Sequence, residues 1–169
     1  MKRIIVFLLI FFNFLYAYQS EKDLKVLITG KVAKFVTWKE DIGDKFVITV
    51  YKNSFEKLFE KKLLAKKIKG KSVEIRYIED ISQLQETHIL YIAKATTDEL
   101  TDIFSKIKGK NVLTVSCMRG FAQKGGAVQI YFVSQKGKLA INLDTIQSEN
   151  FKVKSSFIRV AKLVSGSPM

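Results

Sequence analysis

Apolar residues recur every three or four positions in several segments of the chain, and this spacing predicts amphipathic helices. The first predicted helix is capped by Ser20 and carries its apolar stripe from Leu24 to Val36. The second begins at Asn53, with Glu56 three positions on to complete a capping box, and stops at Gly70. Lysines cover the outer face of this second helix, so we expect its apolar side to pack inward.

Two further helices are predicted in the second half of the chain. Thr96 or Thr97 caps a helix over Asp98–Lys108, whose apolar residues fall on one face. The segment Ser155–Val164 has the spacing of a C-terminal helix. Residues 81–86 form a connector that is compatible with one helical turn.

Segments rich in β-branched and apolar residues separate the helices and predict strands. The apolar run His88–Ala93 is typical of a central strand, and Val112–Ser116 of a short strand covered on both faces. Lys136-Gly137 is a tight-turn signal between two antiparallel strands. The predicted strands cover residues 45–51, 72–78, 88–93, 112–116, 127–133 and 138–143.

Helices and strands alternate along the chain, which predicts an α/β fold. We expect a Rossmann-like sandwich: a central, mainly parallel mixed sheet with helices on both sides and a C-terminal hairpin at the edge. The 169 residues suit one domain. A chain of this size buries roughly 68–70% of its unfolded surface, so its core needs neither a metal nor a disulfide.

The first seventeen residues have the pattern of a signal peptide. Lys2 and Arg3 precede an apolar run over Ile4–Tyr16, and Ala17 offers a small residue at the cleavage position. The run is shorter than the about 20 residues of a transmembrane helix, and a retained short anchor is the alternative. We therefore expect an exported protein with a signal peptide over residues 1–17 and a mature domain over residues 18–169.

The chain is strongly basic, with a formal net charge of +13 that falls to +11 without Lys2 and Arg3. Lysine supplies 25 of the 29 basic residues and arginine only four. Because arginine usually carries bidentate recognition of phosphates and bases, this balance argues against nucleic acid as a partner. We favour a solvated lysine surface. The alternative is attraction to an anionic membrane or to an acidic partner.

Residues that carry catalysis are few and scattered. His88 is the sole histidine and lies at the start of an apolar strand, where a structural role is favoured. Cys117 is the sole cysteine, so it is either buried or paired between chains, and burial is favoured. No GxSxG elbow or triad spacing occurs, and the carboxylates gather in turns and helix starts. We expect no enzyme, no cofactor and no metal site.

The loop Arg119-Gly-Phe-Ala-Gln-Lys-Gly-Gly126 combines glycines with two basic residues. Backbone amides in such a loop can approach an anion, but the spacing is not that of a Walker motif and a strand, not a helix, follows. We favour a tight connection that needs positive φ at glycine. Since loops at strand ends often carry recognition, we select Arg119, Phe121 and Lys124 as candidate partner-binding residues, for their expected exposure and chemistry.

Several blocks of this sequence together resemble the YfiR/HmsC-like family of small exported bacterial proteins. They follow the family's order over nearly all of the mature chain, and the GFA-x-x-GG loop and the AIN strand are the most specific. The blocks are LKVLITGKVAKFVTW (24–38), FVITVYKNSF, THILYIA (87–93), VLTVSCMRGFAQKGGAVQIYFVSQKGKLAINLD and FKVKSSFIRVAKLV.

The resemblance implies a non-catalytic periplasmic regulator with a Rossmann-like fold, often dimeric. Family members with a known role bind the periplasmic sensing domain of an inner-membrane diguanylate cyclase and hold it inactive. Their release raises cyclic di-GMP and promotes biofilm formation. The implied partner is such a cyclase or another sensor protein, with a homodimer as a further alternative. Contact with the membrane is then expected only through that partner.

Two departures from the family pattern affect this expectation. Thr87 stands where many members have a cysteine, so a redox-switched form of the mechanism is not expected here. Lys39 replaces a proline that is common after the FVxW motif, which should affect only the turn. The alternative function is a periplasmic small-ligand binding module that serves a sensor kinase or a transporter.

Overall fold

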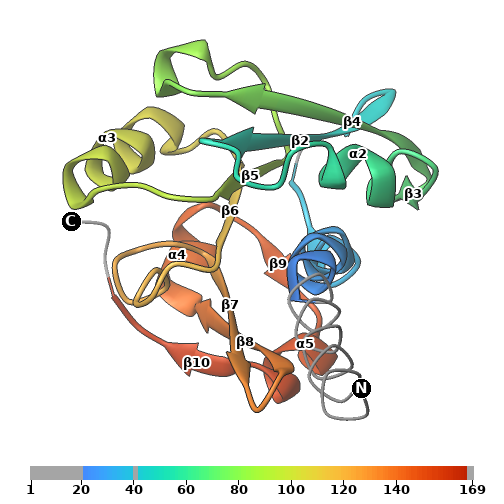
Figure 1. The fold of residues 1–169 in the computed structure, drawn as a ribbon. Coiled ribbons are helices and arrows are strands. Elements are labelled where there is room, and N and C mark those ends of the chain that lie inside the picture. The colour runs from blue at the N-terminus through green and yellow to red at the C-terminus, as the bar shows by residue number, and fades with distance from the viewer. Residues whose placement is uncertain (1–20, 40–41, 167–169) are drawn as a thin grey trace, which may run out of the picture.

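The computed structural model describes residues 21–39 and 42–166, and a single twisted sheet dominates it (Figure 1). Its strands are β2 (Lys45–Tyr51), β3 (Lys67–Ile68), β4 (Lys71–Ile78), β5 (Ile89–Ile92), β6 (Leu113–Ser116), β7 (Val128–Val133), β8 (Lys136–Asn142) and β10 (Lys162–Val164). They lie in the order β10-β8-β7-β6-β5-β2-β4-β3. The pairs from β4 across to β7 are parallel, whereas β7–β8 and β3–β4 are antiparallel.

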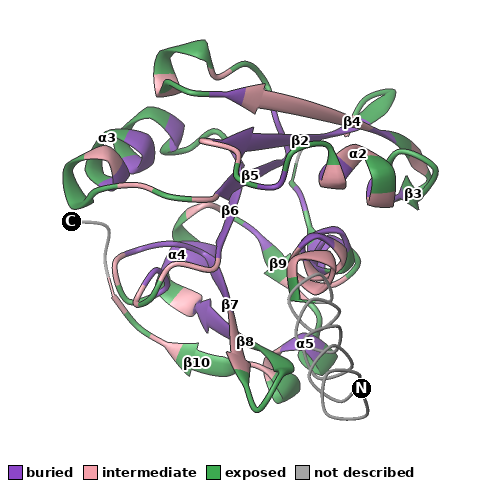
Figure 2. Cartoon of the chain, viewed as in Figure 1, coloured by how far each residue is buried: buried purple, intermediate pink, exposed green. Residues whose placement is uncertain are grey.

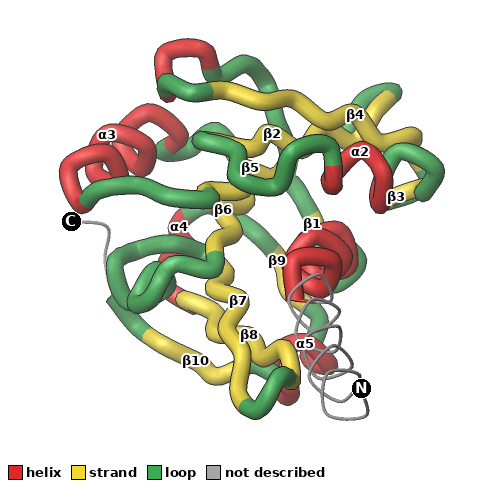
Figure 3. The backbone as a smooth tube through the Cα atoms, in the orientation of Figure 1, coloured by secondary structure: helices red, strands yellow, loops and turns green. Residues whose placement is uncertain are grey.

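Helices cover both faces of this sheet, as the sequence predicted. A helix over residues 21–32 and α2 (Leu58–Leu63) lie on one side, and α3 (Thr97–Ile107) lies on the other (Figures 1 and 3). Two short strands, β1 (Val36–Thr37) and β9 (Lys152–Val153), pair with each other apart from the main sheet. The remaining elements are the 3₁₀ turn η1 (Ile81–Gln83), α4 (Leu143–Ser148) and α5 (Ser155–Val160).

The core has two parts, one on each face of the sheet (Figure 2). Strand β5 shows how they are divided, because successive side chains of a strand point to opposite faces. Ile89 and Tyr91 belong to the larger part, which the helix over residues 21–32 and α2 cover. Leu90 and Ile92 belong to the smaller part under α3. Burial on both faces explains the continuous apolar run of this strand.

Local sequence signals were reliable where they were strong. Strand β2 covers the predicted residues 45–51, and β5 and β6 lie within their predicted ranges. Thr96 caps α3 through a capping box: its Oγ1 accepts from the Glu99 N–H (3.2 Å), and the Glu99 carboxylate accepts from the Thr96 N–H (2.9 Å). The connector at residues 81–83 is a 3₁₀ turn.

The start of the second predicted helix is wrong. Asn53 does not form a capping box with Glu56; its Oδ1 accepts from the Phe55 N–H (2.9 Å) and its Nδ2 donates to the Glu56 carbonyl (2.8 Å). These bonds build a turn in which Glu56 has φ 52°, a conformation incompatible with a helix. Helix α2 therefore begins at Leu58, and Gly70 lies in the β3–β4 turn instead of ending a helix.

The predicted hairpin turn is displaced by two residues. Ser134 and Gln135 form it, with φ 47° and 63°, and Lys136 and Gly137 already belong to β8. Positive φ at both central positions is the geometry of a type I′ turn, which matches the twist of the flanking strands. Glycine at 137 serves packing instead, because an added Cβ would lie 2.8 Å from the Ile28 side chain.

The chain after residue 142 differs most from the prediction. Helix α4 follows β8 directly and was not predicted. The C-terminal helix ends at Val160, and Lys162–Val164 form β10, which pairs in parallel with β8. The β7–β8 hairpin is therefore one strand in from the edge. The first helix also ends earlier than predicted, at residue 32, and Val36 belongs to β1.

The predicted signal peptide (1–17) and the predicted cap at Ser20 lie outside the described residues. Among residues 21–39 and 42–166, no helix has the length and apolar character needed to cross a membrane.

Candidate functional site

The loop that joins β6 to β7, residues 117–127 (hereafter the glycine loop), is held by hydrogen bonds at both ends. Ser116 Oγ donates to the Ile92 carbonyl (2.7 Å) and accepts from the Met118 N–H (3.0 Å). At the far end, the Ala127 N–H donates to Thr114 Oγ1 (2.8 Å). Gly120 and Gly125 have φ of 73° and 99°, as predicted for a tight connection. The loop is a preorganised surface feature.

Phe121 is the anchor of the glycine loop, and its prediction as an exposed contact is wrong. Its side chain is 0% exposed and packs in the smaller core near Phe104, with ring centroids 6.0 Å apart. A Cβ added to Gly126 would lie 2.1 Å from the Phe121 ring. Gly126 is therefore required by close packing, since the loop turns over the aromatic ring. The GFA-x-x-GG pattern reflects this packing more than exposure.

Asn142, at the end of β8, ties the glycine loop to the C-terminal part of the chain. Its side chain is 0% exposed, and Nδ2 donates to the carbonyls of Ala122 (2.7 Å) and Gly166 (2.6 Å). Oδ1 accepts from the Thr145 N–H (3.1 Å), which caps α4. One buried amide thus positions three segments, which gives the AIN block a structural reason.

Arg119 and Lys124, the other two candidate contact residues, remain accessible but contact different elements. Arg119 is exposed and lines a shallow pocket of about 250 Å³ with Cys117 and with Lys25 of the helix over residues 21–32. Lys124 is half-buried, and its Nζ donates to Thr97 Oγ1 (3.4 Å) at the start of α3. The structure does not bring the two cations together around one ligand position.

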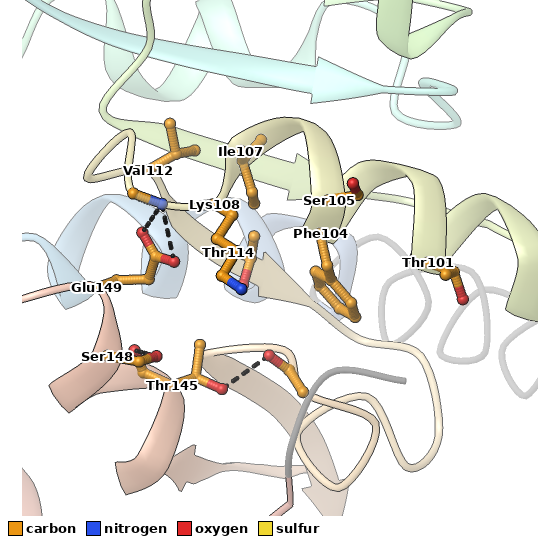
Figure 4. A pocket seen from close by; sticks show the side chains of 12 residues that line it. Thr101, Phe104, Ser105, Ile107, Lys108, Val112, Thr114, Thr145, Ser148 and Glu149 are labelled. Atoms are coloured by element: carbon orange, nitrogen blue, oxygen red, sulfur yellow. Dashed lines mark hydrogen bonds between the residues drawn. The ribbon is translucent and has the colours of Figure 1, made fainter.

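A larger cavity of about 700 Å³ lies between α3 and α4, beside the start of β6 (Figure 4). The view shows Phe104, Ile107 and Val112 on the α3 side, with Thr145 and Ser148 of α4 facing them. The glycine loop forms part of the cavity wall through Gly125. The lining residues are Thr101, Phe104, Ser105, Ile107, Lys108, Gly109, Val112, Thr114, Gly125, Thr145, Ser148 and Glu149. An apolar wall with hydroxyl groups opposite it is the composition of a small-molecule site.

Most polar groups around this cavity are already bonded. The Glu149 carboxylate accepts from the Gly109 N–H with both oxygens (3.0 and 3.2 Å), which joins α4 to the end of α3. Thr145 Oγ1 donates to the Gly125 carbonyl (2.9 Å). Exposed Lys108 at the rim supplies a positive charge.

Sequence reasoning missed this site because α4 was not predicted. The available signal for the start of this helix was Asn142 followed by the apolar residues Leu143 and Ile146.

His88 has a structural role. Its Nδ1 accepts from the Val47 N–H (2.9 Å), and its ring stacks on Phe46 with centroids 4.9 Å apart. Burial lowers the pKa of His88, so the neutral ring is favoured at neutral pH. A neutral imidazole held by a backbone donor inside a strand pair positions the backbone and is not available as a base.

Cys117 is half-buried at the end of β6 and is not set up as a nucleophile. The Tyr91 hydroxyl donates to its Sγ (3.3 Å), but burial dominates and raises the pKa of Cys117. A reactive thiol needs the opposite shift. Among the described residues, no group of three or more His, Cys, Asp or Glu side chains could hold a metal ion.

Comparisons with known proteins agree with this architecture. The model of the YfiR/HmsC-like family matches residues 22–162. No curated protein matches the chain. Among solved structures, the fold is similar to that of the ABC domain from Streptococcus pneumonia in complex with L-Trp, at 12% identity and a TM-score of 0.57. That match covers 83% of this chain but only 62% of the other protein, so it shows a shared fold alone.

Proposed function

Because the chain belongs to the YfiR/HmsC-like family, we propose that it binds the sensor domain of an inner-membrane diguanylate cyclase and holds the cyclase inactive. Family membership implies a periplasmic, non-catalytic regulator of cyclic di-GMP signalling. The proposal adds the kind of partner and the direction of control. Lower cyclic di-GMP and reduced biofilm formation are the expected consequences.

The chemistry of the described residues is consistent with a binding role. Three ionisable side chains with shifted pKa values are used in the fold. His88 accepts a backbone hydrogen bond, and Cys117, whose pKa is raised by burial, accepts from the Tyr91 hydroxyl. The Glu99 carboxylate, whose pKa is lowered chiefly by its bond from Lys52, accepts from the Thr96 N–H in the capping box of α3. These groups are occupied by structural bonds, and they do not converge on one reacting position.

The proposal also includes how the repression would be released. Thr87 is 4% exposed, and its hydroxyl accepts from Thr49 Oγ1 (2.9 Å) and donates to the Ile89 carbonyl (3.0 Å). The hydroxyl thus fills a position where many relatives have a cysteine. With Cys117 as the sole cysteine of the chain, an internal disulfide cannot form. Release is therefore proposed to depend on binding equilibria: an effector that weakens docking shifts the cyclase towards its active state.

Arg119 and Lys124 remain the proposed contacts of the glycine loop. Their backbone is fixed by the bonds at both ends of the loop, so docking would require little ordering of the main chain. Phe121 is excluded from this role by its burial. Its contribution is to hold the loop in place.

A reconstitution in cells tests the proposal. The chain is expressed with a cyclase that has a periplasmic sensor domain, and cyclic di-GMP is quantified by mass spectrometry. Wild-type chain should lower cyclic di-GMP, and the double variant Arg119→Ala/Lys124→Ala should restore it. Lys136→Ala/Lys138→Ala, which removes the same charge from the exposed β7–β8 hairpin, is the control and should repress normally. Unchanged cyclic di-GMP with both proteins present in the periplasm would refute repression.

A second candidate function, small-ligand binding, is favoured by the cavity between α3 and α4. The similar ABC domain was solved in complex with L-Trp, which makes L-Trp a reasonable first probe. A ligand whose free concentration is 100 times its dissociation constant stabilises the folded protein by about 2.7 kcal/mol. A rise in melting temperature that disappears in Ser105→Trp, which fills the cavity, would support this function. Lys106→Trp, exposed on the same helix, is the matched control.

A further inference from the structure

Six lysines of this chain lie within eleven residues at one tip of the molecule, formed by the end of α2 and the β3–β4 turn. The segment over residues 61–71 (hereafter the lysine tip) is Lys-Lys-Leu-Leu-Ala-Lys-Lys-Ile-Lys-Gly-Lys, and no acidic residue occurs from 61 to 73. Strand β3 is the outermost strand of the sheet on this side. In Figure 1 the tip projects from the edge opposite α3.

Most of these charges are exposed and unneutralised. Lys61, Lys66 and Lys67 are exposed, and neither they nor half-buried Lys71 form an ion pair with any residue that the structure describes. Lys62 is the exception, since it pairs with Asp23 at 2.6 Å. A lysine-rich surface ordinarily serves solubility, and soluble surfaces usually mix lysines with acidic residues. Solubility alone therefore does not explain a cluster of lysines that lacks acidic residues.

Neighbouring elements add positive charge around the tip. Helix residue Gly30 packs against α2 and β3, since its added Cβ would lie 2.9 Å from Leu63 and 3.7 Å from Ile68. Exposed Lys31 follows it directly. Lys69 lies over the Trp38 ring, 5.9 Å from its centroid. Desolvation lowers the pKa of Lys69, and the positive charge of Lys154 lowers it further. An anion at this surface would relieve that repulsion.

The tip also exposes apolar surface among its charges. Leu64 is 49% exposed at the end of α2, and the exposed Ala65 follows it. An exposed leucine with two lysines on either side of it in the sequence suits the interface of a bilayer, where lysine stems extend along the headgroups and a short apolar side chain enters the boundary.

We propose that the lysine tip docks on the surface of an anionic phospholipid bilayer, with Leu64 at the headgroup boundary. Lipid is favoured over an acidic protein because protein interfaces are depleted in lysine and enriched in arginine and aromatic residues, whereas residues 61–71 contain neither of the latter. Lysine ammonium groups on flexible stems act as point charges that suit a fluid array of phosphates. This inference adds a direct membrane contact to the one expected through the partner.

The contact would also help the proposed function, on which its biological use rests. A regulator held at the outer surface of the inner membrane searches for its membrane-bound partner in two dimensions, at a raised local concentration. The tip and the glycine loop belong to different parts of the sheet, at β3 and at the β6–β7 connection. Lipid docking can therefore leave Arg119 and Lys124 accessible.

Vesicle co-sedimentation tests the proposal with the mature chain, separately from any cyclase. The probes are phosphatidylcholine vesicles with and without about 30% phosphatidylglycerol, whose negatively charged headgroups make the membrane surface anionic. The expected result is binding to the anionic vesicles alone, weakening steeply as salt is raised. The tip variant K61Q/K66Q/K67Q/K71Q should lose affinity by about six hundredfold, since each of its four lysines near the surface contributes about fivefold.

Two controls separate the tip from overall charge. K94Q/K106Q/K110Q/K138Q removes the same charge from exposed lysines elsewhere and should retain nearly all binding. Leu64→Ser should weaken the salt-resistant part of binding, whereas Val133→Ser, at a 52% exposed site on the β7–β8 hairpin, should not. Urea unfolding of each variant verifies that its fold is intact.

Three outcomes would overturn the inference. These are no binding to anionic vesicles at low salt, equal losses in the tip and control variants, or a tip variant that binds vesicles normally but no longer represses a cyclase. The last outcome would assign the tip to an acidic protein surface. Vesicle binding with no repression in cells would retain the tip as a lipid-docking surface and refute the cyclase proposal instead.

Discussion

Replacing Gly126 by alanine is a direct test of how the glycine loop is built. The added Cβ would lie 2.1 Å from Cε1 of Phe121 and 2.4 Å from Cδ1 and Cζ. Carbon atoms in favourable contact are about 3.5–4.0 Å apart, so a shift of a few tenths of an ångström cannot relieve the overlap.

Neither partner in this contact is free to move. The Gly126 N–H donates to the Phe121 carbonyl (3.0 Å), and the next amide, of Ala127, donates to Thr114 Oγ1 (2.8 Å). The Phe121 ring is itself 0% exposed. Overpacking a core typically costs about 1–3 kcal/mol, and we expect Gly126→Ala to lose about 3 kcal/mol of unfolding free energy.

Urea unfolding of the mature domain measures this loss, and a double-mutant cycle with Phe121→Ala identifies its cause. Phe121→Ala alone should cost about 3–5 kcal/mol through the cavity it leaves. Adding Gly126→Ala to it should cost little more, which gives a coupling close to the about 3 kcal/mol expected for Gly126→Ala alone. Gly120→Ala is the matched control, since no atom lies within 4 Å of its added Cβ and only its φ of 73° is unfavourable. It should cost about 1–2 kcal/mol without coupling to Phe121. An unchanged urea midpoint for Gly126→Ala, or additive losses in the cycle, would refute this packing.

Three further predictions concern single groups. Thr96→Ala removes the cap that bonds the Glu99 N–H and should cost about 1 kcal/mol in urea unfolding, whereas no loss would show that the cap is dispensable. The pKa of His88 is lowered in the folded state, so the unfolded chain binds more protons; stability should fall as pH drops below about 6.5, and an equal fall in His88→Asn would contradict this assignment. Burial raises the pKa of Cys117, to which Tyr91 donates, so iodoacetamide at pH 8 should label native chain far more slowly than urea-unfolded chain; equal rates would show an accessible thiolate.

Elements with strong local signals could be predicted because the signals lie within the element. Strand β2 combines β-branched residues with a polar boundary, and α3 has its capping box and apolar stripe in one stretch of chain. The positive φ at Gly120 and Gly125 likewise follows from the sequence of the loop itself. The parallel sheet followed from the alternation of helices and strands.

The candidate site was only partly predictable, because exposure depends on what packs around a residue. Arg119 and Lys124 were placed correctly at a surface loop, but Phe121 was not. An aromatic residue next to a glycine in a loop looks accessible in sequence; its burial depends on α3, which supplies Phe104 from elsewhere in the chain. The cavity forms where α4 lies near α3. The placement of these two helices relative to each other has no signal in the local sequence.

By itself, the sequence determined the α/β class, the family and the identity of the strongest helices and strands. Tertiary structure decided the use of the weaker segments. Lys162–Val164 continues the helical spacing of α5, yet it becomes a strand because Ala140–Asn142 offers a free strand partner. Asn53 makes a turn instead of a cap: its Oδ1 accepts from the Phe55 N–H, and Glu56 has a φ of 52° that a helix cannot contain. Short segments have comparable energies as helix or strand, so long-range hydrogen bonds and packing select between them.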